Sequence, residues 1–247
     1  MSYIQEQLSD GIFLFGWKSE PPCTPFAPTY THYLTEKKIF SEEECESWSK
    51  YLLEQEPILF DKHRISTGDA GTGLGPTSLT TRWPYYNVLD FDFHLIPKLK
   101  TEIFNGIKTI LSISDNTNWK ETLYSKAWFN VLRKNEQMSP HSHGLHEHTF
   151  YGFHLTIGAK KTFTSYYHPV TFPFIPADAF HVPNNAGYLT LFPDFVPHSV
   201  TLNNYETPRI SIAGDIFGSS MLGTKYDTGK QDASRSGMMD CTELGKL

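Results

Sequence analysis

The sequence predicts an α+β protein, in which two helices in the first half of the chain are followed by an antiparallel β-sandwich or barrel. Two patterns predict this class. Apolar residues recur at helical spacing in two segments before residue 113, and six short β-rich runs begin at about residue 122. The composition agrees, because 39% apolar and 15% aromatic residues suffice for a large core and exclude disorder throughout.

The first helix is predicted over residues 41–55, after an irregular, strand-rich stretch at 1–40 that is interrupted by prolines. Ser41 suits the N-cap position, because its hydroxyl can accept a hydrogen bond from a backbone N–H of the first turn. The three glutamates at 42–44 favour the positive end of a helix. Both signals place the helix start at the same residue.

The second helix is predicted over residues 91–112, where apolar residues recur near helical spacing at Leu95, Leu99, Ile103, Ile107 and Ile110. Between the helices, residues 66–78 form a glycine-rich segment. It lacks the G-K-[ST] of a phosphate-binding loop, and no apolar strand leads into it. We therefore expect a plain mobile loop there.

The β-rich runs are separated by turn residues. They span 123–132, 149–157, 161–168, 187–193, 196–202 and 209–217. Residues 219–247 contain few large apolar side chains, which predicts a surface arm. Neither an internal repeat nor an interdomain linker is evident, so residues 1–247 are expected to form one domain. Its parts would be a mixed helical support at 1–120, a β core at 121–218 and a C-terminal arm at 219–247.

Charge and cysteine content exclude several classes of protein. A net charge of −6 and a pI of about 6.0 argue against nucleic acid as a partner. No apolar run reaches the ~18 residues of a membrane span, and the N-terminus lacks the basic start of a signal peptide. The three cysteines are far apart, which excludes a disulfide framework or a zinc–thiolate site and favours a cytoplasmic setting.

Histidines are concentrated in one segment. The chain has 11, and five of them lie within residues 141–154. His141 and His143 are two positions apart, so an extended strand would present both on one face, close enough to share a metal ion. His146 and His148 repeat the spacing after Gly144. A third ligand must come from elsewhere in the chain, and the candidates are His168, His181 and His198.

His198 is the best third candidate, because it follows an apolar strand and a proline-rich bend. A turn at residues 203–206 would pair the flanking strands and place His198 opposite Ser211. Arg209 would then project to the same face as both residues. An arginine so close to a metal suggests a bound carboxylate, since the guanidinium makes bidentate contacts with carboxylates.

With these residues, the stretch 127–217 resembles the Fe(II)/2-oxoglutarate-dependent oxygenase superfamily. The resemblance is carried by A-W-F-N-V-L, H-S-H, G-Y-L-T-L-F-P, P-H-S-V and R-I-S. It is closest to a branch, found in bacteria and phages, whose first ligand segment reads H-x-H. The resemblance implies a distorted double-stranded β-helix, a cupin-like jelly roll with N-terminal supporting helices.

The resemblance also implies the roles of individual residues. His141, His143 and His198 would bind Fe(II), and Arg209 and Ser211 would bind the far carboxylate of 2-oxoglutarate. The arginine follows the distal histidine by 11 positions, where the superfamily has about ten. His143 stands where that pattern usually has an acid, which leaves the iron at a charge of +2. Three-histidine sites also bind zinc.

Other residues near these motifs have open or structural interpretations. His146 or His148 could replace His143 as ligand. Asn130 could donate to a carboxylate oxygen of the cosubstrate or form a structural hydrogen bond, and Trp128 could line the same cavity. His154 is expected to be a hydrogen-bonded core residue, His168 and His181 are expected to be solvated in loops, and Phe192 and Phe195 are expected to pack in the core.

The resulting hypothesis is an Fe(II)- and 2-oxoglutarate-dependent dioxygenase that hydroxylates a small molecule or protein. No catalytic residue is assigned beyond the metal ligands. Two alternatives stay open: a non-catalytic jelly-roll binding module, for example on a virion, and a three-histidine cupin-like enzyme that does not use 2-oxoglutarate. The sequence does not identify the prime substrate or the oligomeric state.

Overall fold

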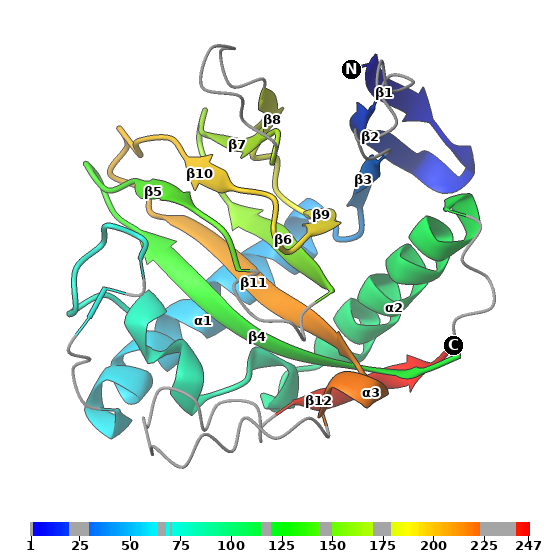
Figure 1. Ribbon diagram of the computed structural model, residues 1–247. Coiled ribbons are helices and arrows are strands. Elements are labelled where there is room, and N and C mark those ends of the chain that lie inside the picture. Colours follow the sequence, from blue (N-terminus) through cyan, green and yellow to red (C-terminus); the bar gives the residue numbers. More distant parts are fainter. Residues whose placement is uncertain are drawn as a thin grey trace.

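The computed structural model describes residues 2–19, 30–63, 68–69, 71–114, 120–143, 150–169, 179–222 and 241–247. Within these residues it confirms the α+β class (Figure 1). The two long helices are α1 (Glu42–Lys62) and α2 (Ile96–Ile113), and α3 (Ser219–Leu222) is short. None of the helices described is both long and apolar enough to cross a membrane.

The larger sheet has eight strands and contains only antiparallel pairs. Its order is β1-β2-β3-β9-β6-β11-β4-β12. The bounds are β1 Ser2–Gln7, β2 Ile12–Lys18, β3 Thr31–Lys38, β4 Thr122–Leu132, β6 Tyr151–Gly158, β9 Tyr188–Pro193, β11 Arg209–Gly218 and β12 Thr242–Lys246. All six predicted β-rich runs contain strands, and four of these runs contribute to this sheet.

The smaller sheet has four antiparallel strands in the order β5-β10-β7-β8. The bounds are β5 Met138–His141, β7 Phe163–Tyr167, β8 Ala179–Pro183 and β10 His198–Val200. In Figure 1 this sheet lies in front of the larger sheet, and α1 lies behind the larger sheet. The larger sheet therefore has one face toward the helices and one face toward the smaller sheet.

Side chains of the central strands alternate between these two faces, as the pleat of a strand requires. In β4, Phe129 packs in the main apolar core together with residues of α1 and α2, whereas Asn130 lines the cavity on the side of the smaller sheet. In β11, Ile212 belongs to that core and Ser211 points the other way. Polar residues are thus gathered between the two sheets.

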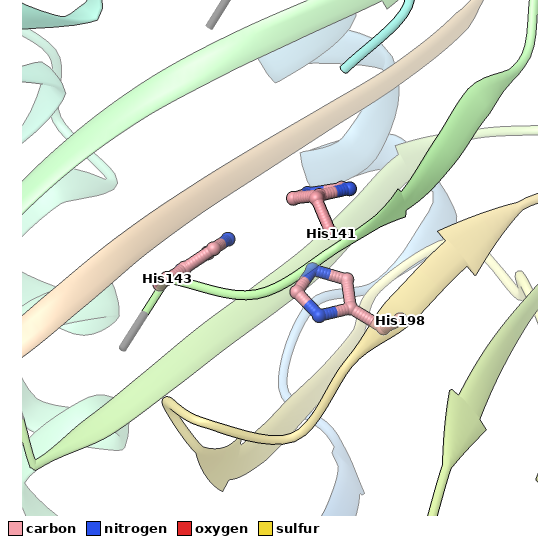
Figure 2. A group of neighbouring side chains, drawn as sticks. All are labelled: His141, His143 and His198. Carbon is pink, nitrogen blue, oxygen red and sulfur yellow. The ribbon is translucent and has the colours of Figure 1, made fainter. Parts of the chain in front are cut away.

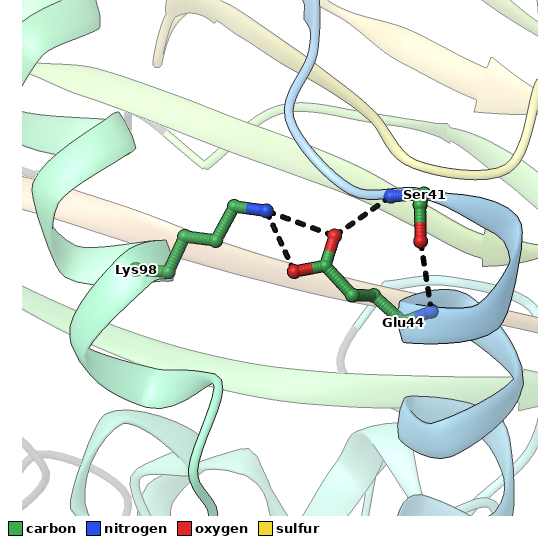
Figure 3. Close-up of polar contacts among 3 residues, drawn as sticks. All are labelled: Ser41, Glu44 and Lys98. Atoms are coloured by element: carbon green, nitrogen blue, oxygen red, sulfur yellow. Dashed lines mark hydrogen bonds and ion pairs between the residues drawn. The ribbon is translucent and has the colours of Figure 1, made fainter.

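Helix α1 begins where the sequence predicts, with Ser41 as its N-cap (Figure 3). The Ser41 hydroxyl accepts from the Glu44 backbone N–H, and the Glu44 carboxylate accepts from the Ser41 N–H. Lys98 near the start of α2 donates to both oxygens of the same carboxylate, at 2.6 and 2.8 Å. The helix continues past the predicted end at residue 55, through Pro57, to Lys62.

We expect Ser41→Ala to lower the free energy of unfolding by about 1 kcal/mol, because it removes a capping acceptor and half of the capping box. Denaturant unfolding of both proteins measures the difference. Glu46→Ala is a suitable control, since Glu46 is exposed in the same helix. Equal losses in the two variants would contradict a specific capping effect.

Helix α2 starts at Ile96, five residues later than predicted. Residues Val88–Asp90 form a separate 3-10 turn, and Pro97 occupies the first turn of α2. Proline suits the first turn of a helix, where its missing N–H needs no partner, whereas deeper in a helix it removes a hydrogen bond, so Pro97 favours the later start. The predicted buried face is confirmed, with Leu99, Ile103 and Ile107 fully buried.

The predicted hairpin between His198 and Ser211 is wrong. β10 pairs with β5 and β7, whereas β11 pairs with β4 and β6 in the other sheet. Asn203 holds the connecting segment: its side chain bridges the turn to the Thr207 carbonyl, and the same residue is bound to the β4–β5 connection. Its side-chain amide donates to the Leu132 carbonyl, and its backbone bonds to Asn135 and Glu136.

The end of the chain differs from the expected surface arm. β12 pairs with β4 and forms the edge of the larger sheet, and its partner residues include Thr122 opposite Lys246. Leu247 also donates its backbone N–H to the Glu121 carbonyl. Residues 223–240 lie outside the described part of the chain. The short run T-E-L-G-K has too little apolar alternation to be recognised as a strand before its neighbour is known.

Candidate metal centre and anion pocket

A cavity of about 220 Å³ lies between the two sheets. The larger sheet contributes Trp128, Asn130, Phe153, His154, Arg209, Ser211 and Asp215 to its wall, and the smaller sheet contributes His141, Thr164, His198 and Val200. His143, which follows β5, completes the histidine group. All the predicted site residues that the structure describes therefore line one cavity.

His141, His143 and His198 converge in this cavity (Figure 2). One ligand atom from each lies within 4.8 Å of the others. His141 and His198 are directly opposite each other on β5 and β10, with ring centroids 4.4 Å apart. The predicted third member is thus beside the H-x-H pair. His146 and His148 lie outside the described residues.

Hydrogen bonds fix the tautomers of all three rings. The Nδ1 atoms of His141 and His198 each face the backbone carbonyl two residues earlier, at 2.7 and 3.1 Å. Nδ1 of His143 faces a carboxylate oxygen of Asp215 at 2.7 Å. Since carbonyl and carboxylate oxygens only accept, each Nδ1 carries a proton, which leaves Nε2 as the atom of each ring that can bind a metal. This is the arrangement of metal-binding histidines.

His141 and His198 are uncharged at neutral pH. Burial lowers the pKa of His141 to about 4, and the neighbouring His143 lowers it further. Burial also lowers the pKa of His198 well below its usual value, with His141 and His143 adding to the effect. Because a metal binds neutral imidazole, protons do not compete for these two residues near pH 7.

Arg209 is a buried cation in the same cavity, with 1% of its surface exposed. One Nη donates to the Ser211 hydroxyl at 3.0 Å and the other to Nε2 of His154 at 2.5 Å, while Nε has no partner. Among the described residues the guanidinium forms no ion pair. Burial lowers its pKa to about 10, so it stays charged at neutral pH. A buried charge of this kind requires an anion.

Two neighbours of Arg209 can also donate toward a ligand. His154 is buried and hydrogen-bonded, as expected, and its Nδ1 must carry the proton because Nε2 accepts from the arginine. Asn130 faces Ser211 across the β4–β11 pair. Its Oδ1 accepts from the Thr80 hydroxyl at 2.6 Å, which leaves the amide N–H groups as donors. Arg209, Ser211, His154 and Asn130, together called the anion pocket, can thus each offer a hydrogen-bond donor.

The other predictions around the site have mixed outcomes. Phe192 is fully buried, as expected, and its ring packs on His198 at 4.7 Å. Phe195 is 42% exposed, contrary to expectation, because it lies in a turn closed by a hydrogen bond from Val196 to Pro193. His181 is exposed, although in strand β8 and not in a loop.

His168 was expected to be solvated, and this is wrong. It is buried against Trp17, with ring centroids 5.4 Å apart, and Nε2 lies 3.0 Å from the Tyr30 hydroxyl. These two neighbours, Trp17 in β2 and Tyr30 just before β3, lie more than 130 positions earlier in the chain. Its local proline-rich context did not show this contact.

Several residues of the wall were not predicted from the sequence. Asp215 is the most important, and the alternation R-I-S-I-A-G-D in β11 could have shown that it shares a face with Arg209 and Ser211. The glycine-rich segment was expected to be a plain loop. Its Thr72 is nonetheless buried in the wall, and the Thr72 carbonyl accepts from the Ser139 N–H at 2.9 Å.

Comparisons with known proteins give matches in structure alone. No family model matches the sequence, and neither does any curated protein. Among solved structures, AviO1 from Streptomyces viridochromogenes matches with a TM-score of 0.51 and 8% identity, over 76% of this chain and 90% of that one. This chain shares the overall fold of AviO1.

Two further matches have lower TM-scores. SnoK, described as a non-heme alpha-ketoglutarate-dependent carbocyclase from nogalamycin biosynthesis, has a TM-score of 0.48 and 12% identity over 74% of this chain and 79% of that one. A prolyl-4-hydroxylase from Pseudomonas putida has a TM-score of 0.47 and 10% identity over 75% and 88%. At such low identity the likeness concerns the fold and not the activity.

Proposed function

We propose that this protein is an Fe(II)- and 2-oxoglutarate-dependent dioxygenase that hydroxylates a small molecule or protein. The observation that carries the proposal is the buried Arg209, which lacks an anionic partner among the described residues and shares a cavity with three convergent histidines. 2-Oxoglutarate has both groups that such a cavity can bind: a keto acid for the metal and a far carboxylate for the arginine cation.

The strand order supports a jelly roll as the core of the proposed enzyme. Strands β4 to β11 are divided between two facing sheets, so that β4, β11, β6 and β9 are neighbours in one and β5, β10, β7 and β8 in the other. Eight antiparallel strands shared in this way between two sheets are typical of jelly rolls. We include the supporting helices and β1–β3 in one domain with this core.

The three histidines would hold the iron through their Nε2 atoms. The donor set fits, because imidazole suits Fe(II) and each ring already has its proton on Nδ1. Bound iron would supply the redox chemistry that couples decarboxylation of 2-oxoglutarate to oxidation of the prime substrate. Three protein ligands would leave the other coordination positions of the iron accessible to 2-oxoglutarate and oxygen.

The remaining residues would bind and orient 2-oxoglutarate. Arg209 and Ser211 would contact its far carboxylate, and the amide of Asn130 would add a third donor. Phe192 would exclude water from the buried end of the cavity, since it is fully buried and lines the cavity. A low-dielectric wall strengthens the contact between carboxylate and guanidinium.

We expect the protein to release succinate from 2-oxoglutarate when Fe(II) and oxygen are present. Succinate is measured with and without a panel of candidate substrates. Protein loaded with Zn(II) is the control, because zinc has no redox chemistry and should give no succinate. Absence of both succinate formation and 2-oxoglutarate binding at millimolar concentration would leave the binding module or the three-histidine enzyme without 2-oxoglutarate as the better interpretation.

A further inference from the structure

We propose that Asp215 is a positioning residue for the metal, acting through His143 in place of the carboxylate ligand that the H-x-H segment lacks. The inference rests on the three-histidine metal site of the proposed function but not on the use of 2-oxoglutarate. Asp215 would supply the negative charge of the site through its hydrogen bond to His143, without binding the metal itself.

The contact between the two side chains is short and shielded. Nδ1 of His143 and Oδ1 of Asp215 are 2.7 Å apart, and only 8% and 13% of the two side chains are exposed. Asp215 belongs to the cavity face of β11, on the same side as Arg209 and Ser211. Because little water reaches the pair, the carboxylate acts strongly on the ring.

The backbone next to His143 and Asp215 leaves room for the two side chains. Gly152 lies directly opposite Asp215 in the β6–β11 pair. A Cβ atom at Gly152 would stand 3.3 Å from Nδ1 of His143 and 2.9 Å from the Phe192 ring, so a larger residue would displace one of the two rings. The backbone N–H of His143 also donates to the Asp194 carbonyl at 3.0 Å, which holds the ligand in place.

His143 differs from the other two histidines in its partner. His141 and His198 donate to neutral backbone carbonyls, whereas His143 donates to a carboxylate. A carboxylate makes the imidazole a stronger donor to a metal and fixes the direction of its lone pair. The anion is therefore attached to the one ligand that occupies the position usually held by an acid in the family that this sequence resembles.

The first test measures metal affinity with Co(II), whose absorption bands report ligand geometry, in the absence of 2-oxoglutarate. We expect Asp215→Asn to weaken Co(II) binding about 10- to 100-fold and to change the spectrum, since loss of such an outer partner has effects of this size. Asp61→Asn on the exposed surface of α1 makes the same change in charge and is the control. An unchanged affinity in Asp215→Asn would overturn the proposal.

A second measurement separates this role from a structural one. In a His143→Asp background the ligand itself carries the negative charge, and Asp215 becomes a second anion without a donor. Asp215→Asn should then leave Co(II) affinity unchanged or raise it, whereas in the natural background it lowers affinity.

The same loss of affinity in both backgrounds would show that Asp215 only supports the fold. A wild-type protein that binds no Co(II) would overturn the proposal as well. Failure to bind 2-oxoglutarate would contradict the proposed function alone, because no step of this experiment contains 2-oxoglutarate.

Discussion

Replacement of His198 by alanine is expected to abolish tight metal binding. His198 is buried beside the other two histidines, with ring centroids 4.4 Å from His141 and 5.0 Å from His143. Its loss would leave two imidazoles, too few for a tight site. We expect affinity to fall by more than about 100-fold, because losing an outer hydrogen-bond partner alone typically costs 10- to 100-fold.

Elemental analysis and metal titration of the purified variants measure this effect. His181→Ala is the matched control, since His181 is exposed on β8 and does not line the cavity. Equal metal content in wild type and His198→Ala would remove His198 from the site. The same measurement separates the two histidine pairs: we expect His141→Ala and His143→Ala to lose metal, and His146→Ala and His148→Ala to keep most of it.

Replacement of Arg209 by alanine is expected to weaken 2-oxoglutarate binding by at least about tenfold. Hydrogen bonds to a charged group contribute about 1.5–3 kcal/mol each, and each 1.4 kcal/mol corresponds to a factor of about ten in affinity. Arg209→Lys should also bind weakly, because an ammonium group cannot reproduce the two-pronged contact of a guanidinium. Iron binding should survive both changes, since Arg209 is not a proposed ligand.

Calorimetric titration of the anaerobic Fe(II) protein with 2-oxoglutarate measures the difference. Arg133→Ala is the control, since the Arg133 side chain is 57% exposed and pairs with Glu56. If wild type and Arg209→Ala bind alike, the carboxylate pocket has been placed wrongly even if the enzyme class is right. If neither binds, the oxygenase proposal fails, whereas the metal site is tested independently by the His198 variant.

Local features of the sequence determined the element types and much of the site. Ser41 and the three glutamates at 42–44 were sufficient to locate the start of α1, because capping and the helix dipole act within the first turn. The spacing of His141 and His143 places both near one point, because the pleat of a strand repeats every two residues. The same repeat put Arg209 and Ser211 on one face, and the structure confirms that they line one cavity.

Only the tertiary structure decided which strands are neighbours. The sequence favoured a hairpin between His198 and Ser211, but the two strands lie in different sheets that face each other across the cavity. His198 and Arg209 nevertheless line one cavity, although their strands are not paired with each other. Asn203 holds the segment between the two strands against backbone atoms about 70 positions earlier in the chain.

The two most informative features of the site also depend on distant parts of the chain. Asp215 reaches His143 across 72 positions, and Arg209 reaches His154 across 55. Alternation along a strand fixes the face on which a side chain lies, since it depends on the local pleat. The partner that the side chain meets on that face, and whether a buried charge is left without one, depends on how the sheets pack, which no local pattern contains.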